Sequence, residues 1–131
     1  MSNKIDKILA EISAGELFDK ITILEIKKAK ISNREKLNDI EKELMSLNET
    51  VKKFIPDQSS ILKHIDDLKD INLRLWAIED GKRAAEKNKD FGKKFIELAR
   101  NVYKLNDERA KIKLAINPSL GSNIKEIESY E

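Results

Sequence analysis

Apolar residues recur along most of this chain at alternating steps of three and four, the spacing that places them on one face of an α-helix. The longest stripe consists of Phe91, Phe95, Leu98, Val102, Leu105, Ile112 and Ile116. Only Arg109 interrupts it. A second stripe, closer to the N-terminus, consists of Leu37, Ile40, Leu44, Leu47, Val51 and Phe54. This pattern predicts an all-α protein.

Breaks between the stripes divide the chain into four expected helices joined by short loops. We expect these helices at about residues 14–31, 33–54, 60–88 and 90–116. Short connections favour antiparallel neighbours, so consecutive helices should pair as two hairpins, the second being the longer. Residues 1–131 are therefore predicted to form a single domain, an antiparallel four-helix bundle with a short docked C-terminal tail.

Capping residues mark the expected starts of three of these helices. Ser13 followed by Glu16 has the spacing of a capping box, in which each side chain binds a backbone N–H near the other residue. The same spacing recurs at Ser32 and Glu35, before the second helix. Asp90 is suited to cap the fourth helix, because its carboxylate can accept from the free N–H groups of a first turn.

Both ends of the chain carry apolar residues outside the predicted bundle. Residues 1–12 fit either a helical face or an extended strand, so their structure stays open. Pro118 is expected to stop the fourth helix, because proline has no backbone N–H. The tail, residues 118–131, contains Ile124, Ile127 and Tyr130. We expect it to fold back onto the bundle, beside residues 8–12.

Composition narrows the class of protein. The chain has no cysteine, which excludes disulfide scaffolds and thiolate metal sites. Its 26 basic and 24 acidic residues are interspersed, unlike the gathered cations of most nucleic-acid binders. No apolar stretch is long enough to span a bilayer. We expect a cytoplasmic protein with no membrane or nucleic-acid partner, although one basic cluster could bind nucleic acid: Lys82, Arg83, Lys87, Lys89, Lys93 and Lys94.

A set of polar residues interrupts the seam between the last two helices. Antiparallel pairing places Asn72 opposite Asn106 and Glu79 beside Arg100, and Arg109 follows Asn106 by three residues. One interpretation is that these residues fix the register of the helices, at some cost in stability. The other is a polar pocket that binds an anionic small molecule, with Arg100 and Arg109 as donors and Glu79 as a general acid or orienting group.

Two further features admit both a structural and a functional interpretation. Trp76, the only tryptophan, is interpreted as a core residue between the two hairpins, with a ligand platform as the alternative. Glu16 and Asp19 stand three residues apart, a spacing that can hold magnesium on a helix. In a chain with this many carboxylates such spacings arise by chance, so we predict no metal and no cofactor.

Four stretches resemble a family of functionally uncharacterised bacterial and phage proteins of about this length. They are SAGELFDKITILEIK (13–27), LWAIEDGKR (75–83), FIELARNVYKLNDERAKIKLAIN (95–117) and GSNIKEIESY (121–130). The resemblance implies one compact domain and no assigned activity. It directs attention to the polar and aromatic residues of these stretches: Glu16, Asp19, Lys20, Trp76, Glu79, Arg100, Tyr103, Asn106, Asp107 and Arg109.

These observations leave two hypotheses for function. The first is a non-enzymatic interaction or regulatory module that self-associates as a homodimer and could also bind another protein. The second is a small-molecule binding protein, or a small enzyme, that uses the polar cluster. No catalytic residue is predicted, and the candidate ligand-binding residues are Glu16, Lys20, Trp76, Glu79, Arg100, Tyr103, Asn106 and Arg109.

Overall fold

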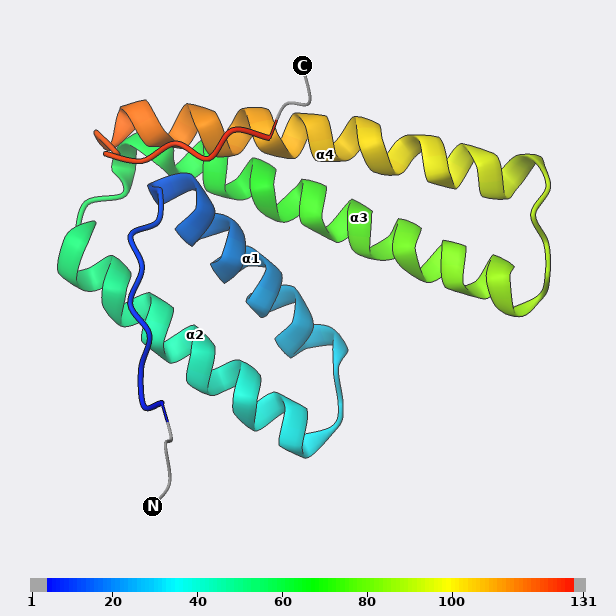
Figure 1. The fold of residues 1–131 in the computed structure, drawn as a ribbon, viewed down its shortest axis with the longest axis horizontal. Coiled ribbons are helices and arrows are strands. Elements are labelled where there is room, and N and C mark those ends of the chain that lie inside the picture. The colour runs from blue at the N-terminus through cyan, green and yellow to red at the C-terminus, as the bar shows by residue number, and fades with distance from the viewer. Residues whose placement is uncertain (1–4, 129–131) are drawn as a thin grey trace.

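The computed structural model describes residues 5–128, and within this range it contains four α-helices and no strand (Figure 1). In chain order they are α1 (Ala14–Lys30), α2 (Arg34–Phe54), the short 3-10 helix η1 (Ser59–Ile61), α3 (Leu62–Lys87) and α4 (Lys93–Ser119). Consecutive helices pair as two antiparallel hairpins, and the second is the longer (Figure 1). The predicted all-α four-helix architecture is confirmed.

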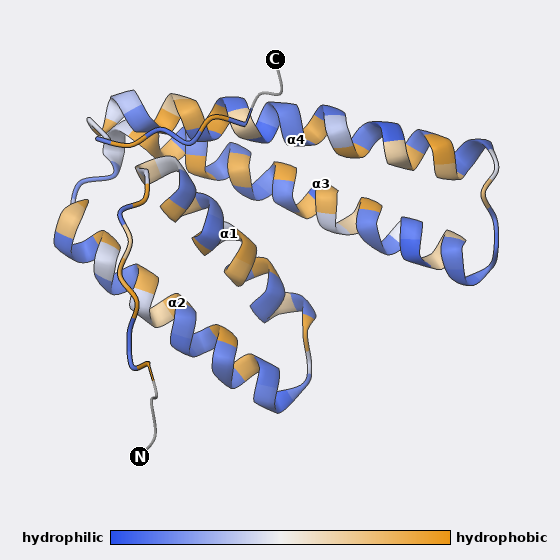
Figure 2. Ribbon diagram, viewed as in Figure 1, coloured by the Kyte–Doolittle hydropathy of each residue, from blue (hydrophilic) through white to orange (hydrophobic). Residues whose placement is uncertain are grey.

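Helix α1 is the centre of the arrangement. It packs against α2, α3 and α4, whereas within the described residues the backbone of α2 approaches no other α-helix. Apolar and hydrophilic residues are interspersed along all four helices (Figure 2). Side chains from every helix meet in one core around α1: Leu17, Phe18, Ile21, Leu24, Ile40, Leu44, Val51, Ile61, Leu68 and Ile116.

The α3–α4 hairpin projects past the α1–α2 pair (Figure 1). A Cβ atom added to Gly81 would lie 3.3 Å from Cδ1 of Leu98, so these two positions face each other. This agrees with the register expected from a turn near residues 88–90. Beyond α1, each helix of this hairpin therefore has only the other to pack against.

Two of the three expected caps differ from the structure. Ser13 caps α1 as predicted, because its Oγ accepts from the Glu16 N–H at 3.1 Å. At α2 the cap is Asn33, whose Oδ1 accepts from the Lys36 N–H at 3.0 Å. The expected Ser32 cap is wrong by one residue, because Ser and Asn both suit the N-cap position and only one residue can occupy it.

The start of α4 is also later than expected. Asp90 does not cap it: its Oδ1 accepts from the Gly92 N–H at 3.3 Å, within the loop. Gly92 is the residue that precedes the helix, and no side chain caps it. Lys89, with φ of 54°, has already turned the chain into the left-handed region. The tight turn therefore uses the Asp90 side chain before α4 begins.

Proline does not stop α4, contrary to expectation. Pro118 lies in the last turn, so its missing N–H removes one helical hydrogen bond, and the helix ends at Ser119. Gly121, with φ of 65°, then reverses the chain. The N–H of Ser122 donates to the Asn117 carbonyl at 2.8 Å and that of Gly121 to the Pro118 carbonyl at 3.3 Å. This pair of bonds is a Schellman motif, which satisfies carbonyls at the helix end.

The C-terminal tail docks where the chain enters α1, as predicted. Residues 5–13 and 123–128 form no helix or strand, and the tail runs back along α4 (Figure 1). Ser122 Oγ accepts from the Ala14 N–H at 3.2 Å, and Asn123 Nδ2 donates to Glu11 Oε2 at 2.8 Å. Tyr130, which the sequence analysis placed in the docked tail, lies outside the described residues.

Candidate functional site

A buried carboxylate on α1 is the centre of the most extensive polar network in the described structure. Asp19 is only 1% exposed. Arg109 of α4 approaches it with two parallel hydrogen bonds, from Nε to Oδ1 at 2.9 Å and from Nη2 to Oδ2 at 2.5 Å. This bidentate geometry is the strongest form of a charge-assisted pair. The arginine that interrupts the apolar stripe of α4 therefore binds an acid across the helix interface.

Helix α3 contributes an amide to the same carboxylate. Asn72 Nδ2 donates to Asp19 Oδ1 at 3.0 Å and lies 2.9 Å from Thr22 Oγ1. Thr22 Oγ1 in turn donates to the backbone carbonyl of Asp19 at 2.8 Å. Asp19 thus connects α1 to α3 through Asn72 and to α4 through Arg109. Such a network specifies one mutual arrangement of these helices, because any displacement would leave a buried group unpaired.

Lys113 extends this network to the C-terminal tail. Its Nζ lies 2.8 Å from Glu16 Oε2, 2.6 Å from Glu128 Oε1 and 3.9 Å from Asp19 Oδ2. The lysine side chain is only 7% exposed, although it lies on a helix with a charged outer face. Three carboxylates therefore surround two cations, Lys113 and Arg109. We call these five residues, together with Asn72 and Thr22, the Asp19 network.

The network shifts the pKa values of Asp19 and Lys113 so that both charged forms are favoured. Burial by itself raises the pKa of Asp19, but the hydrogen bonds from Arg109 and Asn72 and the positive charges of Arg109 and Lys113 bring the pKa below its ordinary value. Burial lowers the pKa of Lys113, but the bonds to Glu128 and Glu16 raise it above the ordinary lysine value. Both residues are thus held in their charged forms.

The arrangement is fully paired. Among the described residues, every buried side-chain nitrogen and oxygen has a hydrogen-bond partner. A catalytic centre usually keeps a group free to bind substrate or to move a proton, whereas here Asp19 already accepts bonds on both oxygens. Chemically, the Asp19 network can orient helices and position Arg109.

The tail completes the cap of α1 with the carboxylate of Glu126. Glu126 Oε1 accepts from the Ser13 N–H at 3.1 Å, and Glu126 Oε2 accepts from the Ser13 hydroxyl. In a complete capping box Glu16 would bind that N–H. Glu16 binds Lys113 instead, so a residue of the tail substitutes for it. The sequence offers no local signal for this exchange.

Replacing Glu126 with glutamine should loosen the tail. We expect a loss of about 1 kcal/mol in the free energy of unfolding, because a charge-assisted bond to Ser13 becomes a neutral one at a partly exposed site. Urea denaturation at pH 7 measures the change. Lys125→Gln is the matched control, since Lys125 is exposed. Equal stability of the two variants would contradict a stabilising role for the Glu126 contact.

The candidate ligand-binding residues do not form one site. Trp76, Glu79 and Arg109 line a pocket of about 340 Å³ between α1, α3 and α4, which we call the Trp76 pocket. Arg100 is exposed and does not line it, so the expected trio of Glu79, Arg100 and Arg109 does not meet. The nearest cation to Glu79 is Lys82, whose Nζ lies 3.5 Å from Oε1.

The remaining candidates lie on two other surfaces. Glu16 and Lys20 line a recess of about 240 Å³ that Arg109 also lines. Tyr103 and Asn106 face a further recess beside the tail. Tyr103 is 58% exposed there, whereas Asn106 Oδ1 accepts from Arg109 Nη1 at 3.3 Å. Of all the candidates, Arg109 alone joins the Asp19 network to the Trp76 pocket.

Trp76 itself is half-buried and lines its pocket, so it is not enclosed between the hairpins as the structural interpretation expected. The reason is the position of α2, which packs on the far side of α1 and leaves this side of α3 uncovered. The other residues that line the Trp76 pocket are Ile23, Ile26, Lys27, Asn72, Leu75, Glu79, Asp80, Arg83 and Arg109.

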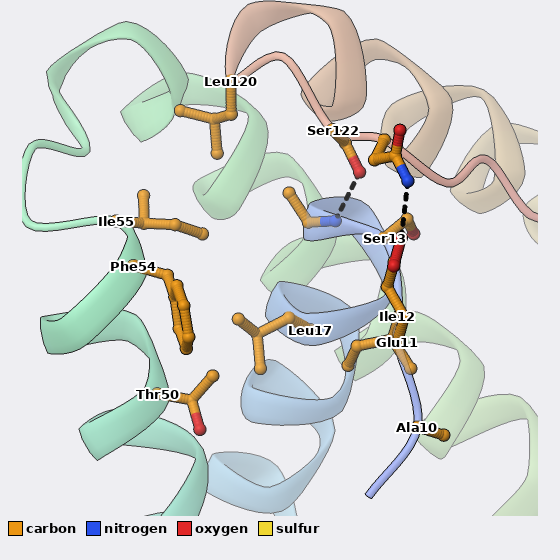
Figure 3. A pocket seen from close by; sticks show the side chains of 12 residues that line it. Ala10, Glu11, Ile12, Ser13, Leu17, Thr50, Phe54, Ile55, Leu120 and Ser122 are labelled. Carbon is orange, nitrogen blue, oxygen red and sulfur yellow. Dashed lines mark hydrogen bonds between the residues drawn. The ribbon is translucent and has the colours of Figure 1, made fainter.

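A second apolar pocket, of about 500 Å³, lies where residues 10–13 and the tail meet the start of α1 (Figure 3). Leu17, Phe54, Ile55 and Leu120 form its apolar walls. Its polar rim is occupied by the Ser122–Ala14 and Asn123–Glu11 hydrogen bonds, drawn as dashed lines in Figure 3. Glu11 is the charged residue among those that line this pocket, and its Oε2 accepts from the neutral amide of Asn123.

Two other sequence-based interpretations concern charge. Near the hairpin tip, Lys82 pairs with Glu79 and Arg83 with Asp80, so two members of the basic cluster have acidic partners. Within residues 5–128, no three histidine or carboxylate side chains gather as a metal site requires. None of the described helices is long and apolar enough to cross a bilayer.

Together, these features define an all-helical bundle in which one buried ion-pair network links three helices and the tail. The chain belongs to DUF6165, a family of unknown function, whose model matches residues 8–131. The resemblance to an uncharacterised family found in the sequence is thereby confirmed. No curated protein and no solved structure matches the chain.

Proposed function

We propose that this protein is an interaction module that pairs with a second copy through the projecting α3–α4 hairpin. The observation that carries the proposal is the composition of α3 between Ile71 and Ile78, where apolar residues surround the whole helix: Ile71, Leu73, Leu75, Trp76, Ala77 and Ile78. A helix that is apolar on all sides is normally covered on all sides. Here α4 and α1 cover only part of it.

The uncovered face of α3 forms a groove with α4. This outer groove has a volume of about 480 Å³, and residues of α3 and α4 alone line it: Arg74, Ala77, Ile78, Asn101, Lys104, Leu105 and Glu108. Leu73, beside it, is 40% exposed. Two such hairpins placed face to face would bury these residues and produce the four-helix packing that a lone hairpin lacks.

Charge favours an antiparallel arrangement of the two copies. Residues 82–94, at the tip, contain six basic and two acidic side chains, a net charge of +4. Residues 66–80, nearer the base, contain five acidic and two basic side chains, a net charge of −3. A two-fold axis near the middle of the hairpin would place each tip against the base of the other copy. Opposite charges would then face each other at both ends.

Replacing Ala77 with glutamate should weaken this association. Ala77 is exposed in the chain alone, so the change adds a charge to the outer groove without disturbing the core. We expect the dimer dissociation constant to rise by at least about tenfold, because the carboxylate would lose water in the interface. Sedimentation equilibrium over a range of concentrations measures it.

Ala99→Glu is the matched control, because Ala99 is exposed on the same hairpin and does not line the outer groove. It should leave the dissociation constant unchanged. Raising the salt concentration from about 0.1 to 0.5 M should weaken pairing, because salt screens the attraction between tip and base. A wild-type chain that stays monomeric at high concentration would refute the proposal.

A further inference from the structure

We propose that the Trp76 pocket binds a small planar aromatic carboxylate. The inference is independent of self-association, because the pocket is formed by a different face of α3 from the outer groove. Its volume, about 340 Å³, falls at the lower end of the range for small-molecule sites. A single ring or a fused pair of rings with one carboxylate matches that size.

The walls of the pocket select a flat apolar body. Ile23 and Ile26 on α1 and Leu75 and Trp76 on α3 form its apolar surface. Trp76 is half-buried and lines the pocket. Stacked or edge-on contact with such a ring favours an aromatic partner over an aliphatic one of equal size.

The acidic groups of the pocket are already neutralised by neighbours on α3. Glu79 Oε1 lies 3.5 Å from Lys82 Nζ, and Asp80 Oδ1 lies 4.0 Å from Arg83 Nη1. Both pairs link residues three apart on one helix, where such contacts form readily. The pocket therefore does not present an isolated negative charge that would recruit a cationic ligand.

A positive charge remains on α1. Lys27 lines the pocket and forms no ion pair with any other residue in the described range of the chain. It lies in the last turn of α1, on the same side of the helix as Ile23, four residues earlier. One unpaired ammonium group beside an apolar wall suits a ligand with a single negative charge.

Arg109 supplies directional donors at the α4 side of the pocket. A guanidinium group has five N–H donors. Three of them are used: Nε and Nη2 bind Asp19, and Nη1 donates to Asn106 at 3.3 Å. Two remain, on a side chain that is 26% exposed and lines the pocket. The Asp19 network thus holds Arg109 in place, with spare donors available to a carboxylate oxygen.

The only tryptophan of the chain reports on this site directly. Sodium benzoate is the first probe, and excitation of Trp76 at a wavelength that benzoate does not absorb follows its binding. We expect saturable change in Trp76 fluorescence and a higher thermal midpoint, because a ligand that binds the native state stabilises it. Benzamide, which has the same shape but no charge, and cyclohexanecarboxylate, which has no aromatic ring, should each bind at least about fivefold more weakly.

Lys27→Gln tests the source of the anion preference without touching the Asp19 network. We expect the dissociation constant for benzoate to rise about tenfold, because a charge-assisted contact is lost. Lys28→Gln is the matched control: Lys28 is exposed, does not line the pocket, and should leave affinity unchanged. Each variant is first shown to keep the wild-type thermal midpoint in the absence of probe.

Three results would overturn the proposal. The first is neither a fluorescence change nor a thermal shift with benzoate up to millimolar concentrations. The second is equal affinity for benzamide, which would show that the negative charge of benzoate does not contribute to binding. The third is an equal loss in the Lys27→Gln and Lys28→Gln variants, which would make the effect one of net charge. The Ala77→Glu chain should bind benzoate like the wild type, so failure of self-association does not affect this test.

Discussion

Replacing Asp19 with alanine is expected to lower the free energy of unfolding by about 3–5 kcal/mol, the usual cost of removing one partner from a buried ion pair. The change leaves Arg109 without its bidentate acceptor and Asn72 without one of its two bonds. Most of the cost is therefore the penalty for a guanidinium group left partly buried and unpaired. Denaturant unfolding at pH 7 measures the loss.

The double variant Asp19→Ala with Arg109→Met is the decisive control. It removes both charges of the pair and leaves an apolar side chain in place of the arginine stem. We expect the double variant to be more stable than Asp19→Ala alone, because no buried charge remains unpaired. Arg109→Met alone completes the comparison. If the losses for Asp19→Ala and Arg109→Met add up to the loss for the double variant, the carboxylate and the guanidinium do not act as a pair.

The same carboxylate should make the fold sensitive to acid. The pKa of Asp19 is below that of an unfolded aspartate, which is about 4. Its contribution to stability is complete above the unfolded value and is lost as the pH falls through the lower folded value. The difference in unfolding free energy between wild type and the double variant should therefore shift against the wild type as the pH falls below about 4. An unchanged difference would mean that Asp19 does not titrate with folding.

Replacing Gly15 with alanine is expected to be the most damaging change of a single methyl group. The added Cβ would lie 2.2 Å from the backbone oxygen of Lys113, closer than atoms can approach. Because the obstacle is backbone, no side-chain rotation can relieve it, and α1 must move away from α4. That movement would stretch the 2.8 Å bond from the Gly15 N–H to Asn117 Oδ1.

We expect Gly15→Ala to cost about 3 kcal/mol, at the upper end of what overpacking usually costs. The matched control is Gly81→Ala, which also adds a methyl group inside a helix. There the nearest atom is Cδ1 of Leu98, at 3.3 Å, and a leucine side chain can shift. The gain in helix propensity, up to about 1 kcal/mol, should offset the strain. Equal thermal midpoints for the two variants would contradict the close approach of α1 and α4.

The candidate site was only partly accessible to sequence reasoning. Arg109 was identified because it interrupts an apolar stripe, and a charged residue on a buried face requires a partner. Arg100 was assigned to the same cluster wrongly, and helix geometry explains why. It lies nine residues before Arg109, which is about two and a half turns, so the two side chains point to opposite sides of α4.

The partners of Arg109 had weaker signals. Lys113 stands one turn after it, and Glu16 and Asp19 stand one turn apart on α1, so each pair shares a face. Those spacings show which residues can act together within one helix. They do not show that the two pairs face each other, because Asp19 and Arg109 are 90 residues apart in the chain.

The sequence by itself determined the local structure of the chain. Apolar periodicity and the Ser13 cap specify that four helices form and which face of each is buried, because these features depend on neighbours within a turn or two. The tertiary structure alone decided which polar groups meet: Glu126 replaces Glu16 at the α1 cap, and Asp19 receives Arg109 and Asn72. These contacts depend on how helices dock, and docking is set by packing over the whole core, which no single segment encodes.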